Sequence, residues 1–277
     1  MTVWAILLAP FVLILLVAAT HVYFGLHVLA RGIIFVDLAL AQIAAVGASV
    51  AFLLGWDGHG AAAQGAALAA ALAASLAFAQ LRRVPDTVTR EVVIGCAYVV
   101  AIALSILILS RSTTGMEELK TLLNGNILWV GWGDIGILAA VYAVIAVVHL
   151  AWRRRFLALS LAGPRAGERA LLWETLFFTS FAVVITLAVM VAGVLVVFAL
   201  LIIPAFSASL VATGFARRLV AGWALAAAGS AAGLGLAYVA DLPVGAAVVS
   251  VLGLVPVLAA ILPRIAGIAR DPAKQVH

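Results

Sequence analysis

The sequence contains very little charge for its length. Only 10% of its 277 residues are charged, whereas a soluble domain usually carries about 25%. The remainder is strongly apolar, with 67% hydrophobic residues and a mean hydropathy of +1.28. This composition excludes an ordinary water-soluble domain, and it also excludes a disordered chain, which needs few apolar residues. The single cysteine, Cys96, excludes an intrachain disulfide framework and a cysteine-based zinc site.

The sequence also lacks the motifs of several enzyme and channel classes. It has no GxxxxGK[ST] loop to cradle nucleotide phosphates, and no HExxH zinc motif. It has no GxSxG nucleophile motif, and no arginine ladder marks a voltage sensor. We therefore expect a protein that is not an enzyme and binds no cofactor of its own.

Long hydrophobic runs follow one another along the whole chain. A bilayer core about 30 Å thick requires about 20 apolar residues per helix. The sequence predicts an all-α, polytopic transmembrane bundle of eight or nine helices, with residues 1–277 forming a single domain. The stretch 171–212 is too long for one helix, and it is predicted either as two helices or as one helix with a re-entrant segment. The expected spans are 3–30, 33–54, 62–81, 91–110, 132–151, 172–190, 191–212, 219–240 and 244–262.

The basic residues between the spans predict how the chain is oriented. With the N-terminus outside and the C-terminus in the cytoplasm, 14 of the 16 basic residues lie in cytoplasmic segments, as the positive-inside rule requires. This placement accounts for the net charge of +5 without a nucleic-acid partner. The 14 residues are Arg31, Arg82, Arg83, Arg90, Arg153, Arg154, Arg155, Arg165, Arg169, Arg217, Arg218, Arg264, Arg270 and Lys274.

Five polar residues within the predicted spans are candidates for a transport pathway, because an ionisable group in lipid is costly unless it is paired or hydrated. They are His21, His27, Asp37, Gln42 and Glu91. His21 and His27 are six residues apart and differ by roughly 120° around a helix, so they do not share one face. Each histidine could instead be a packed imidazole bonded to a carbonyl. Asp37 and Glu91 could instead be acids at helix N-termini, where the helix dipole favours them.

Two further ionisable residues have simpler interpretations. His149 ends the fifth predicted span beside a basic segment, so we expect it to lie at the membrane interface. Glu174 begins the sixth span, where a carboxylate is favoured by the helix dipole.

Four segments, taken in order, resemble the membrane-spanning permease subunits of zinc-, manganese- and iron-type ABC importers. The second contains the family's acidic-x-x-x-Gly pattern as Glu91 and Gly95, and the third its Gly-x-Ile-Leu segment ending at Asp134. The fourth has an Ile-Pro-Ala helix around Pro204 and a closing Asp-Leu-Pro-x-Gly motif that starts at Asp241. The segments are 24–55, 89–109, 122–138 and 192–219 with 233–249.

One position departs from the family's pattern. Members usually have a histidine on the second helix, four residues after an aspartate, and alignment on Gly47 places Gln42 there instead. Asp37 then lies one position early, with Leu38 at the usual aspartate position. Because an amide oxygen is a harder and weaker ligand than imidazole, the substitution leaves manganese, iron, a metal chelate or another small solute as alternatives to zinc.

The resemblance implies partners and a mechanism. The chain would form a homodimer in the bacterial inner membrane, with two cytoplasmic ATP-binding subunits that hold ATP-Mg and an extracytoplasmic solute-binding protein. Import of a divalent metal would proceed by alternating access. Segment 205–219, with Thr213, Gly214, Arg217 and Arg218, is predicted to couple the chain to the ATPase, although these arginines could serve only orientation.

Other classes of protein remain as alternatives. One is a stand-alone secondary transporter or channel, which would work without an ATPase. Another is a membrane enzyme, for which the sequence offers no reactive cluster.

Overall fold

The computed structural model describes residues 3–56, 60–162 and 170–265. Throughout these ranges the regular secondary structure is helical, with eleven α-helices and no strand, so the predicted all-α fold is confirmed. The helices are α1 (Val3–Arg31), α2 (Val36–Leu53), α3 (Ala61–Gln80), α4 (Thr87–Leu109), α5 (Gly115–Asn124), α6 (Trp132–Ala151), α7 (Arg153–Ala162), α8 (Ala170–Ala192), α9 (Val194–Val211), α10 (Phe215–Ala240) and α11 (Val244–Ile265).

Nine of the described helices are long and apolar enough to cross a membrane. They correspond one to one with the nine predicted spans, although α4 and α10 each begin four residues earlier than expected. The two remaining helices, α5 and α7, are ten residues long and occupy the polar gaps between spans. The chain is therefore a multi-pass membrane protein.

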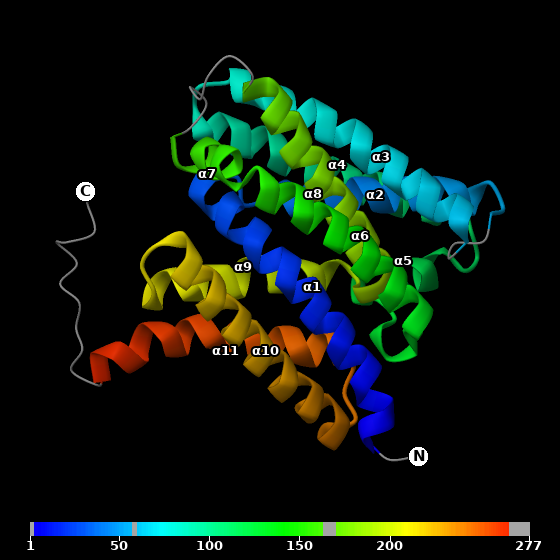
Figure 1. Cartoon of the computed structure of the whole chain (residues 1–277). Helices are drawn as coiled ribbons and strands as arrows, with labels where there is room; N and C mark the ends of the chain where they lie inside the picture. Colours follow the sequence, from blue (N-terminus) through cyan, green and yellow to red (C-terminus); the bar gives the residue numbers. More distant parts are fainter. Residues whose placement is uncertain (1–2, 57–59, 163–169, 266–277) are drawn as a thin grey trace.

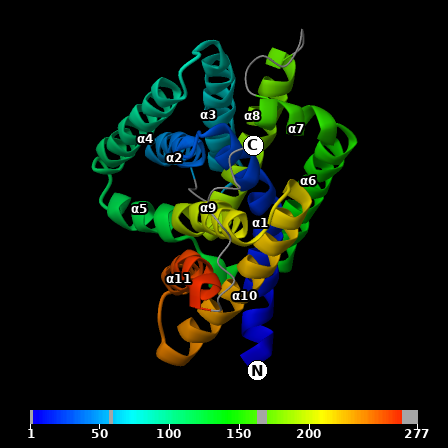
Figure 2. The same cartoon turned by 90° about the vertical axis from the view of Figure 1, so that its left-hand side faces the viewer.

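Helix α1 lies at the centre of the bundle (Figures 1 and 2). It contacts α6, α7 and α8 on one side and α9 and α10 on the other. Helices α2, α3 and α4 form one group, in which α2 packs against both neighbours, and α9, α10 and α11 form a second. Figure 2 shows α2, α3 and α4 above α9, and α10 and α11 below it. Any polar group near the end of α1 thus has several helices within reach.

The alanine-rich helix α3 packs closely on α2. Ala63, Ala67 and Ala71 repeat every four residues and are fully buried, which matches the four-residue spacing of one helix face. Opposite them, a Cβ on Gly47 of α2 would lie 2.5 Å from the carbonyl oxygen of Ala66. Small residues on both helices therefore allow the two backbones to approach, as is common in membrane bundles.

The stretch 171–212 forms two helices, α8 and α9, separated by Gly193 alone. Gly193 has φ 78° and ψ 157°, a conformation that is essentially restricted to glycine. A Cβ there would lie 2.2 Å from the backbone nitrogen of Gly125, which also has a positive φ. The chain reverses at this point against the loop after α5, where Asn126 N–H donates to the Val191 carbonyl at 3.1 Å.

Gly193→Ala should destabilise the protein strongly. The conformation alone costs about 1–3 kcal/mol for a residue with a Cβ, and the Gly125 backbone would have to move as well. Thermal unfolding of the full chain in detergent measures the effect. The matched control is Gly235→Ala in α10, where a Cβ meets nothing within 4 Å; it should be neutral or slightly stabilising. Equal midpoints for the two variants would contradict this account of the break.

Candidate functional site

Two of the predicted acids, Asp37 and Glu91, lie on the neighbouring helices α2 and α4. Asp37 is the second residue of α2, so the predicted position in the first turn is confirmed. Its side chain is buried, and neither carboxylate oxygen has a hydrogen-bond partner among the described residues. Glu91 is the fifth residue of α4 and accepts the Phe35 N–H at 2.9 Å through Oε1. Its other oxygen, Oε2, is buried and also lacks a partner within the described part of the chain.

The two carboxylates are close enough for the charge of Glu91 to act on Asp37. A buried carboxylate without hydrogen bonds is costly and is normally neutralised by a proton, a cation or a metal. The unpartnered oxygens of Asp37 and Glu91 therefore each favour a positively charged species. Gln42, a turn and a half further along α2, is buried as well.

This pair does not extend to a complete metal site within one chain. Among the described residues, no three His, Cys, Asp or Glu side chains come together as potential ligands. His21 and His27 lie on α1 and are both buried. Nδ1 of His21 lies 2.8 Å from the Val17 carbonyl oxygen, one turn earlier. Nε2 of each histidine is buried without a partner among the described side chains and backbone.

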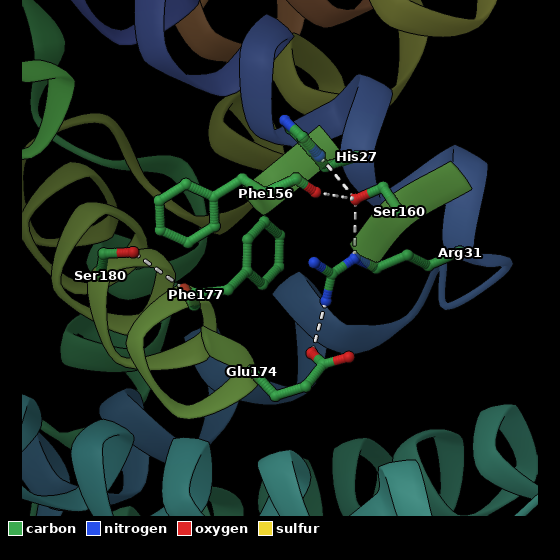
Figure 3. Close-up of polar contacts among 7 residues, drawn as sticks. All are labelled: His27, Arg31, Phe156, Ser160, Glu174, Phe177 and Ser180. Carbon is green, nitrogen blue, oxygen red and sulfur yellow. Dashed lines mark hydrogen bonds and ion pairs between the residues drawn. The ribbon is translucent and has the colours of Figure 1, made fainter. Parts of the chain in front are cut away.

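His27 belongs to a second polar group, at the end of α1 (Figure 3). Arg31 donates from Nη1 to Glu174 Oε2 on α8 at 2.6 Å and from Nε to Ser160 Oγ on α7 at 3.0 Å. Nδ1 of His27 lies 2.6 Å from the same serine oxygen. The Arg31 guanidinium carbon also lies 3.8 Å from the centre of the Phe177 ring, a cation–π distance. Arg31 therefore links α1 to both α7 and α8.

His149, at the end of α6, extends these links. It is buried, with Nδ1 3.1 Å from the Tyr23 hydroxyl on α1 and Nε2 2.8 Å from Ser180 Oγ on α8. Its ring stacks on Phe156 of α7 with centroids 4.0 Å apart. His149 lies in the last turn of its span, as expected, but its ring is buried, because α7 covers the end of α6 and Phe156 stacks on the ring.

Sequence reasoning missed this second group by treating its members separately. Taken alone, Arg31 indicates only the orientation of the chain, and Glu174 indicates only the start of a helix. The sequence does contain one signal for this pair. Arg31 and Glu174 carry opposite charges and both lie at the predicted cytoplasmic ends of their spans, which allows an ion pair. Which helices are neighbours, however, is a property of the tertiary packing.

The predicted coupling segment 205–219 contains a short turn between two membrane helices. It comprises the end of α9, the linker Ala212–Gly214 and the first turn of α10. Gly214 has φ 81° and begins α10. Arg218 donates from Nε to the Ala212 carbonyl at 3.1 Å, while Thr213 and Arg217 are exposed. The Arg218 hydrogen bond thus connects the start of α10 to the linker, and the exposed polar side chains lie beside it.

Removing Glu174 should lower the free energy of unfolding, because it breaks the buried ion pair with Arg31. Its side chain is 10% exposed and that of Arg31 is 6% exposed, so Glu174→Ala leaves a buried charge without its partner. We expect a loss of about 3–5 kcal/mol, measured by thermal or denaturant unfolding in detergent. Glu117→Ala on α5 removes an exposed acid and should change stability by less than about 0.5 kcal/mol. A Glu174 variant no less stable than this control would contradict a stabilising pair.

Comparison with solved structures supports the fold. The chain is similar to a structure of PsaBC from Streptococcus pneumoniae in complex with Fab, with a TM-score of 0.75, 20% identity, and coverage of 94% of this chain and 95% of that chain. It is also similar to a structure assigned as an inward-facing conformation of a metal-chelate type ABC transporter, with a TM-score of 0.65 and 17% identity over 95% of this chain and 86% of that one. No curated protein sequence matched the chain.

A family model covers nearly the whole sequence. The model of the ABC 3 transport family matches residues 4–263. This family comprises the permease subunits of metal-type ABC transporters, which are not themselves catalytic, because the ATPase is a separate subunit. The nine candidate spans, the all-helical fold and this match together show that the chain belongs to the ABC 3 transport family.

Proposed function

We propose that the chain is the permease of an importer that carries a divalent metal ion across the bacterial inner membrane. The observation that carries this proposal is the buried Asp37 carboxylate, whose two oxygens have no partner among the described residues. A group of this kind on a membrane helix marks the path of an ion. Glu91 on the adjacent α4 supplies a second unpartnered oxygen near the same place.

The ligand chemistry favours manganese or iron over zinc. Carboxylate oxygens and the amide oxygen of Gln42 are hard ligands, and such ligands suit Mn²⁺ and, less selectively, Fe²⁺, whereas zinc sites generally use nitrogen and sulfur. His21 and His27 remain candidate ligands in other conformations, since Nε2 of each is free among the described groups. A site with so few ligands binds weakly, which suits release into the cytoplasm.

The small number of candidate metal ligands in one copy of the chain supports a homodimer. Because the described residues of a single copy gather fewer than three metal-binding side chains, a homodimer around a shared pathway would complete the ligand set. Cytoplasmic ATP-binding subunits would hold ATP-Mg, and an extracytoplasmic protein would deliver the solute. The N-terminus would lie outside and the C-terminus in the cytoplasm, which places Arg31, α7 and the turn after α9 on the cytoplasmic side.

Asp37→Asn should abolish metal-stimulated ATP hydrolysis by the complete transporter. The variant keeps the size of the side chain but removes its charge, so the pathway loses its main attraction for a cation. The measurement is ATPase activity of the liposome-reconstituted complex with its binding protein, with Mn²⁺, Fe²⁺ or Zn²⁺ added separately.

Asp241→Asn is the matched control for this measurement. Asp241 is exposed at the end of α10 in a left-handed conformation, with φ 51°, which asparagine also adopts readily. It should respond to metal like the unchanged protein. An undiminished response in the Asp37 variant would remove Asp37 from the pathway.

The likeness to a metal-chelate type transporter gives a second candidate substrate. If the substrate is a chelate, the complex with its binding protein should respond to the chelated metal and not to the free ion. Asp37→Asn should then have little effect, because a chelate carries its own ligands and shields the metal charge.

The turn after α9 is proposed to contact the ATPase. Arg217→Glu reverses an exposed charge and should reduce the amount of ATPase that copurifies with the permease. Arg154→Glu, on the exposed face of α7, makes the same charge change elsewhere on the proposed cytoplasmic side. Equal losses in both variants would indicate a general charge effect and not a docking site at the turn.

A further inference from the structure

A cavity of about 270 Å³ lies where five helices meet near the end of α1. Its walls come from the ends of α1, α3 and α7 and from the starts of α4 and α8. Apolar side chains, such as Phe78 and Ile94, also line the cavity. The cavity is separate from the Asp37 carboxylate, which is not among its lining residues.

The charged groups that line the cavity are predominantly positive. Arg31, Arg82 and Arg90 contribute three guanidinium groups, and Glu174 contributes one carboxylate. Arg90 is close enough for its charge to act on Arg31, so the two repel each other. Glu174 is engaged by Arg31 at 2.6 Å, so Arg31, and not Arg90, is the arginine that it neutralises.

Two of these arginines also have buried donors that are not used. Nη2 of Arg31 and Nε of Arg90 are buried and have no hydrogen-bond partner among the described residues. The Arg31 side chain is only 6% exposed, so water at the surface does not satisfy its free nitrogen. Arg90 donates from Nη2 to the Thr87 hydroxyl at 2.9 Å, which holds its guanidinium at the cavity. A buried unsatisfied donor on a charged group is costly.

The size and chemistry of the cavity match a phosphate group. Arginine guanidinium groups present several donors in a fixed plane and bind phosphate oxygens in pairs. A volume of about 270 Å³ is roughly nine times the share of one water molecule in the liquid. It can hold a phosphate together with part of the group that bears it.

We propose that this cavity binds the phosphate group of an anion through Arg31 at the end of α1, Arg82 directly after α3 and Arg90 on α4. Two sources share this chemistry: the headgroup of an anionic phospholipid, and a phosphate compound in solution. The cavity lies at the ends of membrane-spanning helices, the level at which lipid headgroups occur. A bound phosphate would accept hydrogen bonds from the unused donors of Arg31 on α1 and Arg90 on α4, and so connect these two helices. This site does not depend on which metal the transporter carries.

The test measures thermal unfolding of the full chain in detergent during two titrations. One uses inorganic phosphate against potassium chloride of equal ionic strength. The other uses dioctanoyl phosphatidylglycerol against dioctanoyl phosphatidylcholine. Each is performed on the unchanged protein, on Arg90→Gln and on Arg154→Gln, an exposed arginine on α7 outside the cavity. Arg82→Gln takes the place of Arg90→Gln as the cavity variant if the Arg90 variant does not fold.

A saturable rise in midpoint with phosphate or phosphatidylglycerol is expected, with affinity about tenfold weaker in Arg90→Gln and unchanged in Arg154→Gln. A response to inorganic phosphate identifies a soluble ligand, and a response confined to phosphatidylglycerol identifies the headgroup. The proposal is overturned if neither probe raises the midpoint above its control, or if both variants respond like the unchanged protein.

Discussion

A polar side chain inside a membrane protein must find its partner within the protein, because hydrocarbon offers none. Helix α1 shows how this constraint organises the fold. Its final turns carry His27 and Arg31, which bind Ser160 and Glu174 on two other helices. The short helix α7 is held against the bundle by these contacts and by the stacking of Phe156 on His149. A few polar contacts therefore connect α6, α7 and α8 to α1, and those of Arg31 are charge-assisted.

Asp37 is informative because its carboxylate is not satisfied in this way. Asp37 is as deeply buried as His27, yet its carboxylate oxygens have no partner in the described structure. Groups that pair within the chain stabilise a particular helix arrangement. A carboxylate left unpaired within the chain can still bind a cation from outside it. The contrast between Arg31 with Glu174 and Asp37 with Glu91 thus separates a structural role from a proposed transport role.

Hydropathy predicted the spans well because it is a local property of the sequence. Even in the stretch 171–212, where one or two helices were possible, the sequence contains the residue that divides it: Gly193, whose conformation separates α8 from α9. The paired roles of Arg31 and Glu174 could not be obtained in the same way, since 143 residues separate them. The candidate acids were identifiable individually, but their proximity depends on how α2 packs against α4, and hydropathy does not encode that packing.

Helix α9 connects two regions that have been considered separately. At one end, Gly193 lies directly against the backbone of Gly125, with no side chain between them. At the other end is the turn proposed to meet the ATPase. An 18-residue helix is about 27 Å long, and α9 packs against α1, α10 and α11. Because α9 contains Pro204, bending at that residue would determine how much of a displacement of the 212–214 turn reaches the α5–α6 loop at the other end of the helix.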